Sequence, residues 1–297
     1  MPDKHPHQAE VAAFIQAHIA RGPWTFDYPQ GSGQETYFAG GGGQAYFIKL
    51  GAAIERAQAM AVAELSPPVL AAGRLADGTP ILVQPRIAGR TPGKRDFQEH
   101  LEQVATMLRR MHQDAGVRAV LPPPPSERLD EAGLRRLGAV RRRWEAYKAQ
   151  VPAVAAFVEA ALDRLAAEMA EFVGTGLVAA HNDICNANWL LTPQGRLYLV
   201  DLDAMARDDP AADVGALLWW YYPPALRPRF LRISGYAGDP AFPARMNVRM
   251  ALHCLSITLP RAGSYDGFDP AGYPAALTDF RAILAGEENP QGYGISE

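Results

Sequence analysis

The stretch from His181 to Asp203, HNDICNANWLLTPQGRLYLVDLD, constrains the fold of this chain more than any other. A polar loop is followed by the apolar run WLL, a Pro-Gln-Gly turn and a second apolar run, LYLV, which together predict loop, strand, turn and strand. Asp183 lies in the loop, Asn188 follows five positions later, and Asp201 ends the second strand, thirteen residues beyond Asn188. The fold must therefore present two carboxylates and an amide around one short strand pair.

These three side chains match the needs of one kind of chemistry. Phosphoryl transfer from a magnesium nucleotide uses one carboxylate near the reacting hydroxyl, and an amide with a second carboxylate near the metal. Taken singly, each residue is as readily explained as a cap or turn residue, because Asp and Asn favour such positions. The interpretation depends on whether the rest of the chain supplies a nucleotide site.

The first 86 residues predict a strand-rich unit with one internal helix. Gly31, Ser32 and Gly33 form a loop whose backbone can approach phosphates closely, although a plain turn explains them equally well. Glycines 40–43 separate two alternating segments and predict a hairpin turn, and a second hairpin turns at Asp77-Gly78.

Lys49 ends the strand after the first of these turns. A lysine there is usually a solvated strand end, but the segment AAIERAQAMAVAEL that follows predicts a helix with Glu55 in its first turns. Glu55 can hold Lys49 by an ion pair and aim its ammonium group at nucleotide phosphates. The Lys49–Glu55 pair would supply the nucleotide contact that the interpretation of residues 181–203 requires.

From Asp96 onward the sequence is mainly helical. The segment DFQEHLEQVATMLRRMHQ repeats apolar residues at steps of three and four, as a core-facing helix does. Residues 131–150 carry five arginines, which form either a patch for an anionic ligand or, the interpretation we favour, the solvated face of an amphipathic helix. We therefore predict two domains, residues 1–86 with the nucleotide-clamping sheet and residues 87–297 with the helices, the catalytic loop and the acceptor site.

Composition excludes several other classes. A net charge of −3 and a pI near 6.2 argue against a general nucleic-acid binder. Two cysteines make neither a disulfide framework nor a zinc motif, which suits a reducing compartment. Neither a signal peptide nor an apolar run of bilayer-spanning length is evident, so we expect a cytoplasmic protein with no membrane insertion.

Several of these motifs together resemble the aminoglycoside phosphotransferase and choline kinase superfamily, which is distantly similar to protein kinases. The resemblance rests on His181-Asn182-Asp183 through Asn188, followed by Asp201-Leu202-Asp203, and extends over most of the chain. The segments that carry it elsewhere are GSGQETYF, AYFIKL, ILVQPRIAG, LRRMH and DDPAADVG. It implies an α+β, bilobal, protein-kinase-like fold with an antiparallel-sheet N-lobe and a mainly helical C-lobe.

The resemblance also implies a role for each matching residue, with ATP and Mg²⁺ as cofactors. Asp183 would orient the substrate hydroxyl and accept its proton, while His181 and Asp213 brace the loop. The implied metal ligands are Asn188 and Asp201, with Asp203 assisting a second ion or facing the substrate. The implied nucleotide contacts are Gly31, Ser32, Gly33, Lys49 held by Glu55, and the hinge residues Gln84, Pro85 and Ile87.

Some residues depart from the family pattern. Pro85 removes one N–H from the hinge, which leaves the choice between ATP and GTP open. Asn186 is a rival amide to Asn188, although its spacing from Asp183 is poorer.

The acceptor is the least determined part of the prediction. An acidic tail after Ser264 indicates a cationic or polyhydroxylated amine of the aminoglycoside type, because carboxylates pair with ammonium groups. The aromatic run 219–222 could instead hold a quaternary ammonium, as in a choline or ethanolamine kinase, or could simply pack in the core. A catalytically silent nucleotide-binding protein of the same fold is a further alternative. We predict a small-molecule acceptor and no nucleic-acid partner.

Overall fold

The computed structural model describes residues 6–28, 35–260 and 267–294, and it divides into two compact units. The first unit comprises residues 1–91, 114–120 and 187–204, and the second comprises 92–113, 121–186 and 205–297. Residues 187–204 join the first unit because Leu199 N–H donates to Leu65 O at 2.8 Å and Arg90 pairs with Leu191. The predicted boundary at residue 86 leaves residues 114–120 and 187–204 out of the first unit.

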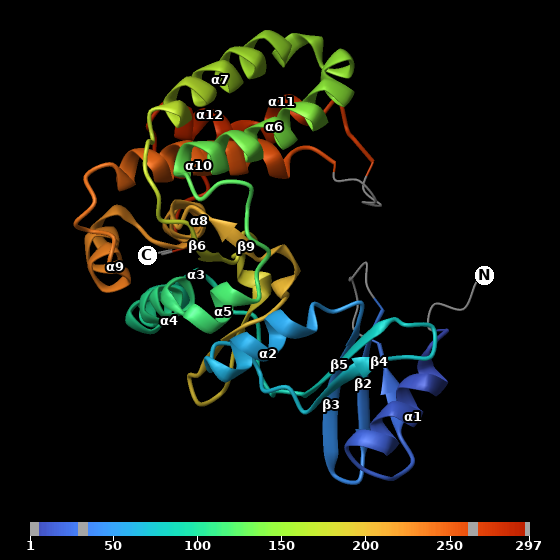
Figure 1. The fold of residues 1–297 in the computed structure, drawn as a ribbon. Helices are drawn as coiled ribbons and strands as arrows, with labels where there is room; N and C mark the ends of the chain where they lie inside the picture. The colour runs from blue at the N-terminus through green and yellow to red at the C-terminus, as the bar shows by residue number, and fades with distance from the viewer. Residues whose placement is uncertain (1–5, 29–34, 261–266, 295–297) are drawn as a thin grey trace. The chain divides into compact units, whose positions relative to one another are not determined.

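The first unit is built on a five-stranded antiparallel sheet in the order β1-β2-β3-β5-β4 (Figure 1). Both predicted hairpin turns are confirmed: Gly42 and Gly43 have φ of +58° and +77°, and Gly78 has φ of +87°. Glycine suits these left-handed positions because it has no Cβ to clash. The elements of this unit are α1 (Gln8–His18), β1 (Thr25–Asp27), β2 (Thr36–Gly41), β3 (Gln44–Leu50), α2 (Ile54–Val62), β4 (Ala71–Arg74), β5 (Pro80–Pro85), α5 (Ala115–Ala119), β7 (Trp189–Leu191), β8 (Leu197–Leu199) and the 3₁₀ turn η3 (Leu202–Ala204).

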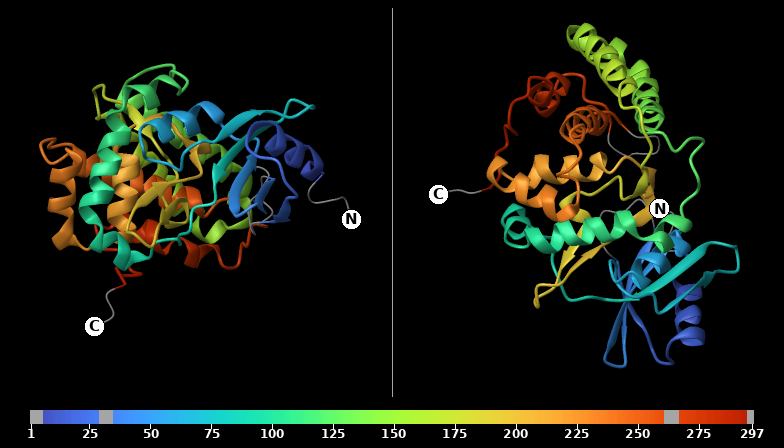
Figure 2. Two further views of the ribbon diagram at one scale, coloured as in Figure 1. Left: turned by 90° about the horizontal axis from the view of Figure 1, so that it is seen from below. Right: turned by 60° about the vertical axis from the view of Figure 1, so that its left-hand side comes forward.

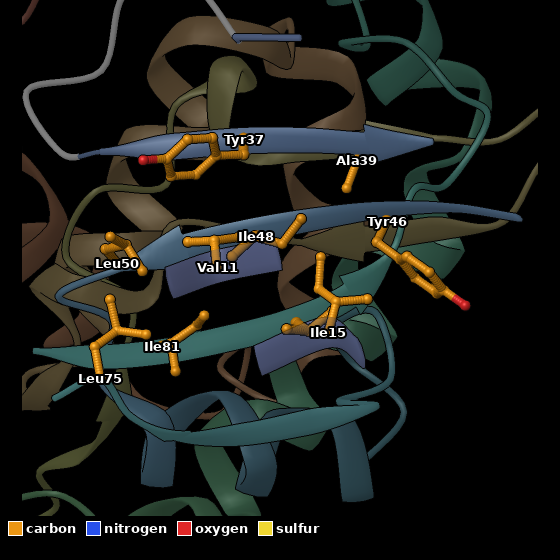
Figure 3. Packing of buried hydrophobic residues seen from close by; sticks show 10 residues of the cluster. Val11, Ile15, Tyr37, Ala39, Tyr46, Ile48, Leu50, Leu75 and Ile81 are labelled. Atoms are coloured by element: carbon orange, nitrogen blue, oxygen red, sulfur yellow. The ribbon is translucent and has the colours of Figure 1, made fainter. Parts of the chain in front are cut away.

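One face of this sheet is covered by α1. Val11 and Ile15 of α1 are fully buried against Tyr37, Ile48 and other apolar side chains of the strands (Figure 3). Alternate residues of β2 and β3 point to this face, as the period of a strand requires. The packing fixes β3, and with it the position of Lys49 near the strand's end.

The second unit is mainly helical. Its helices are α3 (Lys94–Glu99), α4 (Leu101–Gln113), α6 (Leu129–Tyr147), α7 (Pro152–Ala170), α8 (Ala211–Tyr221), α9 (Arg227–Ser234), α10 (Phe242–Ile257), α11 (Tyr273–Ala276) and α12 (Thr278–Leu284), with the 3₁₀ turns η1 (Lys148–Gln150) and η4 (Pro224–Leu226). A two-stranded sheet pairs β6 (Val178–Ala180) with β9 (Ala206–Asp208). The 3₁₀ turn η2 (Asn186–Asn188) crosses from this unit into the first.

Within the second unit, α10 packs against α6, α7, α8 and α12, and α4 packs beside α9 (Figures 1 and 2). The single helix predicted from Asp96 is instead two helices, because His100 leaves helical geometry at φ −98° and ψ 22°. In the described part of the chain, no helix is both long and apolar enough to cross a membrane.

Candidate active site

In the first unit, Lys49 gathers two carboxylates around its ammonium group. Lys49 Nζ donates to Asp201 Oδ1 at 2.8 Å and to Asp203 Oδ2 at 2.7 Å. Burial opposes the charge on Lys49, but the hydrogen bonds and charges of the two carboxylates outweigh it and raise the pKa of the amine above its usual value. The lysine is therefore cationic at neutral pH, and it brings together residues far apart in the sequence.

The chain around Asp201 is positioned by main-chain contacts. Val200 N–H donates to Asn188 O at 2.9 Å, which places Asn188 beside the end of β8. Asp201 itself has φ of +56°, a left-handed conformation that Asp tolerates better than most residues. A guanidinium nitrogen of Arg56 in α2 donates to Asp203 O at 2.6 Å and so anchors the turn η3. The predicted metal ligands Asn188, Asp201 and Asp203 thus belong to one unit.

The predicted ion pair of Lys49 with Glu55 is not formed in the described structure. Glu55 lies in the first turn of α2 and is exposed, while Lys49 has Asp201 and Asp203 as partners. The reason is that the carboxylates of Asp201 and Asp203, about 150 residues later in the chain, contact the lysine instead. Arg56, one position after Glu55, is the residue of this helix that contacts the site.

The predicted hinge residues, Gln84, Pro85 and Ile87, lie at and just after the end of β5. The amide of Gln84 is buried and donates to Pro67 O at 2.9 Å, so this side chain stabilises the unit itself. Pro85 ends β5 opposite Tyr46, and Ile87 follows in the connecting segment. The predicted loop residues Gly31, Ser32 and Gly33 lie outside the described residues.

In the second unit, Asp213 holds the loop that carries Asp183. Its buried carboxylate accepts from His181 N–H at 2.7 Å and from Asn182 N–H at 2.8 Å. Burial raises the pKa of Asp213, but the hydrogen bonds and charge from His112 and the loop outweigh burial and hold this pKa below its usual value. The predicted bracing role of Asp213 is confirmed. Asp183, next in the chain, is only partly buried.

Sequence reasoning missed the part of His112 in this network. His112 lies in the last turn of α4 and is buried. Its Nε2 lies 3.1 Å from Asp213 Oδ2, and its Nδ1 lies 2.7 Å from the hydroxyl of Tyr236. The sequence held one indication of this role: His112 is a polar residue at the end of the apolar stripe in LRRMH, and a buried imidazole needs hydrogen-bond partners. His112 therefore supports the loop through Asp213.

Asn186, the rival to Asn188, is used within the second unit. Its side-chain amide donates to Pro92 O at 3.4 Å, and its main-chain N–H donates to the hydroxyl of Tyr221 at 2.7 Å. Burial raises the pKa of that tyrosine to about 12, so the hydroxyl stays protonated. These contacts favour a structural role for Asn186.

The two features on which the acceptor prediction rested also have structural partners. In the aromatic run, Trp219, Tyr221 and Tyr222 are buried, and the Tyr222 hydroxyl donates to a main-chain oxygen at 2.8 Å. In the tail, Glu288 pairs with Arg227 at 2.6 Å. The aromatic run accordingly packs in the core of the second unit, which was the plainer of its two interpretations.

The fold is similar to those of several solved kinases. A choline/ethanolamine kinase family protein from Mesorhizobium loti has 20% sequence identity and a TM-score of 0.69, covering 96% of this chain and 94% of that one. Choline kinase LicA from Streptococcus pneumoniae has 17% identity and a TM-score of 0.62, covering 93% and 98%. Spectinomycin phosphotransferase APH(9)-Ia, solved with ADP and spectinomycin, has 12% identity and a TM-score of 0.57, covering 96% and 93%. The predicted α+β, kinase-like fold is thereby confirmed.

A model of the family described as Phosphotransferase enzyme family (APH) matches residues 28–246. The matched range includes Lys49, the loop of Asp183 and the pair Asp201 and Asp203. On this evidence, the chain belongs to the Phosphotransferase enzyme family and is a small-molecule phosphotransferase.

Proposed function

We propose that this protein transfers the γ-phosphate of ATP to a hydroxyl of a small molecule. The observation that carries the proposal is the convergence of Asp201 and Asp203 on Lys49 Nζ, at 2.8 and 2.7 Å. A lysine and carboxylates gathered in this way are the parts with which kinases neutralise nucleotide phosphates and their metal ion. The division into an N-lobe of residues 1–86 and a C-lobe of residues 87–297 remains part of this proposal.

The residues of the first unit fit Mg²⁺. Asn188, Asp201 and Asp203 supply the oxygen ligands that this ion prefers, and protein sites for it typically use one or two carboxylates together with substrate phosphates. Asp201 and Asp203 are 49% and 34% exposed in their side chains and already share one cation, the Lys49 ammonium group. When bound, the ion would neutralise phosphate charge, and Lys49 would turn to the α- and β-phosphates. Gly31, Ser32, Gly33 and the hinge at Gln84, Pro85 and Ile87 would complete the nucleotide site.

Asp183 would orient the acceptor hydroxyl and take its proton. Such a carboxylate need not be strongly basic, because in a loose transition state the hydroxyl loses its proton late. Correct placement matters more, and the hydrogen bonds from His181 and Asn182 to Asp213 support that placement. Glu55, exposed in α2, is proposed as a nucleotide contact only through the family resemblance.

The sequence predicts a cationic or polyhydroxylated amine as acceptor. The names of the similar structures divide between choline kinases and an antibiotic phosphotransferase, so a choline or ethanolamine kinase is the alternative. Both readings share a small hydroxylated acceptor that enters the second unit near Asp183.

The proposal is tested by replacing Asp183 with asparagine. We expect the rate of ADP formation to fall by about 10²–10⁴-fold, the usual contribution of a positioned acid–base group, while the Kd for Mg-ATP measured by calorimetry stays within a factor of two or three. Asp163→Asn, at an acid on α7 that is 74% exposed, is the matched control and should leave both quantities unchanged. Near-wild-type turnover in Asp183→Asn would refute the assignment. Binding of Mg-ATP with no ADP formed from any acceptor would favour the catalytically silent alternative.

A further inference from the structure

The hydroxyl of Tyr221 binds the loop that carries Asp183. Tyr221 is the last residue of α8 and is buried, with 7% of its surface exposed. Burying a hydroxyl costs free energy unless it forms a hydrogen bond, and a phenylalanine ring would fill the same space without that cost. The partner of the hydroxyl is the main-chain N–H of Asn186, at 2.7 Å. The hydroxyl therefore serves the loop rather than the packing of the helix.

This hydrogen bond acts on the path of the loop itself. An amide N–H can only donate, so the tyrosine oxygen is the acceptor. Asn186 opens the 3₁₀ turn η2, and the first N–H groups of a helical turn have no partner within it. The bond holds a main-chain group three residues after Asp183, so it constrains where the chain leaves that residue.

Asp213, in the first turn of the same helix, binds the loop on the other side of Asp183. Its carboxylate accepts from His181 N–H and Asn182 N–H at 2.7 and 2.8 Å. Tyr221 follows Asp213 by eight residues, which is about 12 Å along the helix axis. The single helix α8 therefore binds the main chain both before and after Asp183, and helix geometry sets the distance between the two supports.

The side chain of Tyr221 is itself fixed by α3, which packs against α8. Its ring stacks on that of Phe97, with the centroids 4.3 Å apart and the planes at 28°. Gln98 Nε2 donates to the main-chain oxygen of Tyr221 at 3.0 Å. The next residue, Tyr222, is fully buried and donates its hydroxyl to Phe97 O at 2.8 Å. These contacts hold the Tyr221 hydroxyl in one place, as a group that supports a functional site requires.

We propose that Tyr221 is a positioning residue for phosphotransfer: its hydroxyl holds the loop at Asn186 and so sets the place of the Asp183 carboxylate. The inference rests on the proposed role of Asp183 and adds a support on the side of the loop away from Asp213. With Asn186 released, the chain after Asp183 can shift while the bonds to Asp213 stay intact. Such a shift matters because a misplacement of about 1 Å can lower the rate about 100-fold.

The test is Tyr221→Phe, which removes the hydroxyl and keeps the ring. We expect kcat to fall about tenfold, while the KM for the acceptor and the Kd for Mg-ATP stay within a factor of two or three. The acceptor used is the compound that yields most ADP with wild-type protein in a screen of aminoglycosides, choline and ethanolamine. In hydrogen-exchange NMR, the amide of Asn186 should exchange at least tenfold faster than in wild type, whereas the amides of His181 and Asn182 should keep their rates.

Tyr222→Phe is the matched control. It makes the same chemical change at the next residue, whose buried hydroxyl binds α3 instead of the loop. Each variant loses one hydrogen bond, so the two should lower the Tm by similar amounts. Only Tyr221→Phe should lower kcat, and Tyr222→Phe should stay within a factor of two or three of wild type. A loss of turnover that merely follows stability would appear in both.

The outcomes separate this inference from the proposed function. A kcat in Tyr221→Phe equal to wild type, or lowered no more than in Tyr222→Phe, would overturn the positioning role, as would an unchanged exchange rate at Asn186. Phosphotransfer stands in each of these cases, because the wild-type protein still forms ADP. Absence of ADP from wild-type protein with every acceptor contradicts the proposed function instead, and the positioning role falls with it.

Discussion

Asp213→Asn is the most informative change in the second unit. Asp213 Oδ2 accepts from His181 N–H and contacts His112 Nε2, at 2.7 and 3.1 Å, while Oδ1 accepts from Asn182 N–H at 2.8 Å. Asparagine has one carbonyl oxygen, so its best orientation keeps the contacts of Oδ2 and turns an NH₂ group toward the N–H of Asn182. One charge-assisted bond, of about 1.5–3 kcal/mol, is lost and the others weaken. Burying a neutral amide costs less desolvation free energy than burying a carboxylate, and this offsets part of the loss.

The expected net loss is about 2–4 kcal/mol in the free energy of unfolding, measured by urea denaturation. Turnover should fall as well, because the loop that positions Asp183 loses one of its two main-chain anchors. Asp163→Asn makes the same chemical change at an exposed ion pair with Arg141 and should cost less than about 1 kcal/mol. A loss in Asp213→Asn no larger than in this control would refute the reasoning.

Three further predictions concern pH, a close backbone approach and the lysine. The pKa of the Asp213 carboxyl is lower in the folded than in the unfolded protein, so the stability that the carboxylate contributes is complete above the unfolded pKa and is lost as the pH falls through the folded pKa. The difference in stability between wild type and Asp213→Asn should therefore shrink below about pH 4. Urea titrations from pH 3 to 6 that find a constant difference would contradict this. Gly41→Ala would put a Cβ 2.6 Å from the carbonyl oxygen of Pro23 and should lower the free energy of unfolding by about 1–3 kcal/mol. Gly22→Ala, whose Cβ would have nothing within 4 Å, is the control and should leave the Tm nearly unchanged. Equal Tm values for the two variants would contradict this, because the strand edge would then relax freely. Lys49→Met removes the cation between two carboxylates and should raise the Kd for ATP at least tenfold (about 1.4 kcal/mol). The effect on stability should be small, since the two carboxylates, Asp201 and Asp203, are partly exposed. Unaltered nucleotide affinity by calorimetry would argue against a phosphate contact.

Local sequence was most informative where a short pattern specifies its own geometry. The glycines at 42 and 43 predict a hairpin because two consecutive left-handed positions need residues without a Cβ. The apolar repeat of three and four likewise predicts the buried face of α4, where Leu101, Val104, Leu108 and Met111 are buried. The break at His100 was not predicted, because the apolar repeat continues across it and a helix boundary of this kind depends on packing.

Partners distant in the sequence were predicted less well. Glu55 was the nearest acid able to reach Lys49 along the chain, but Asp201 and Asp203 lie closer in the fold. The acidic tail was interpreted as facing a cationic acceptor, yet Glu288 pairs with Arg227. A charged residue takes the partner that tertiary structure brings nearest, and composition does not reveal which one that is.

The sequence by itself predicted a phosphotransferase, from the order and spacing of Asp183, Asn188 and Asp201 along a single loop and hairpin. Only the tertiary structure decided how that chemistry is held and what surrounds it. Arg136 and Arg249 come from helices far apart in the chain, and their shared contact with Asp208 exists only after α6 and α10 pack. The ion pairs of Asp208 are therefore a property of the packed helices, since the sequence does not place these groups together.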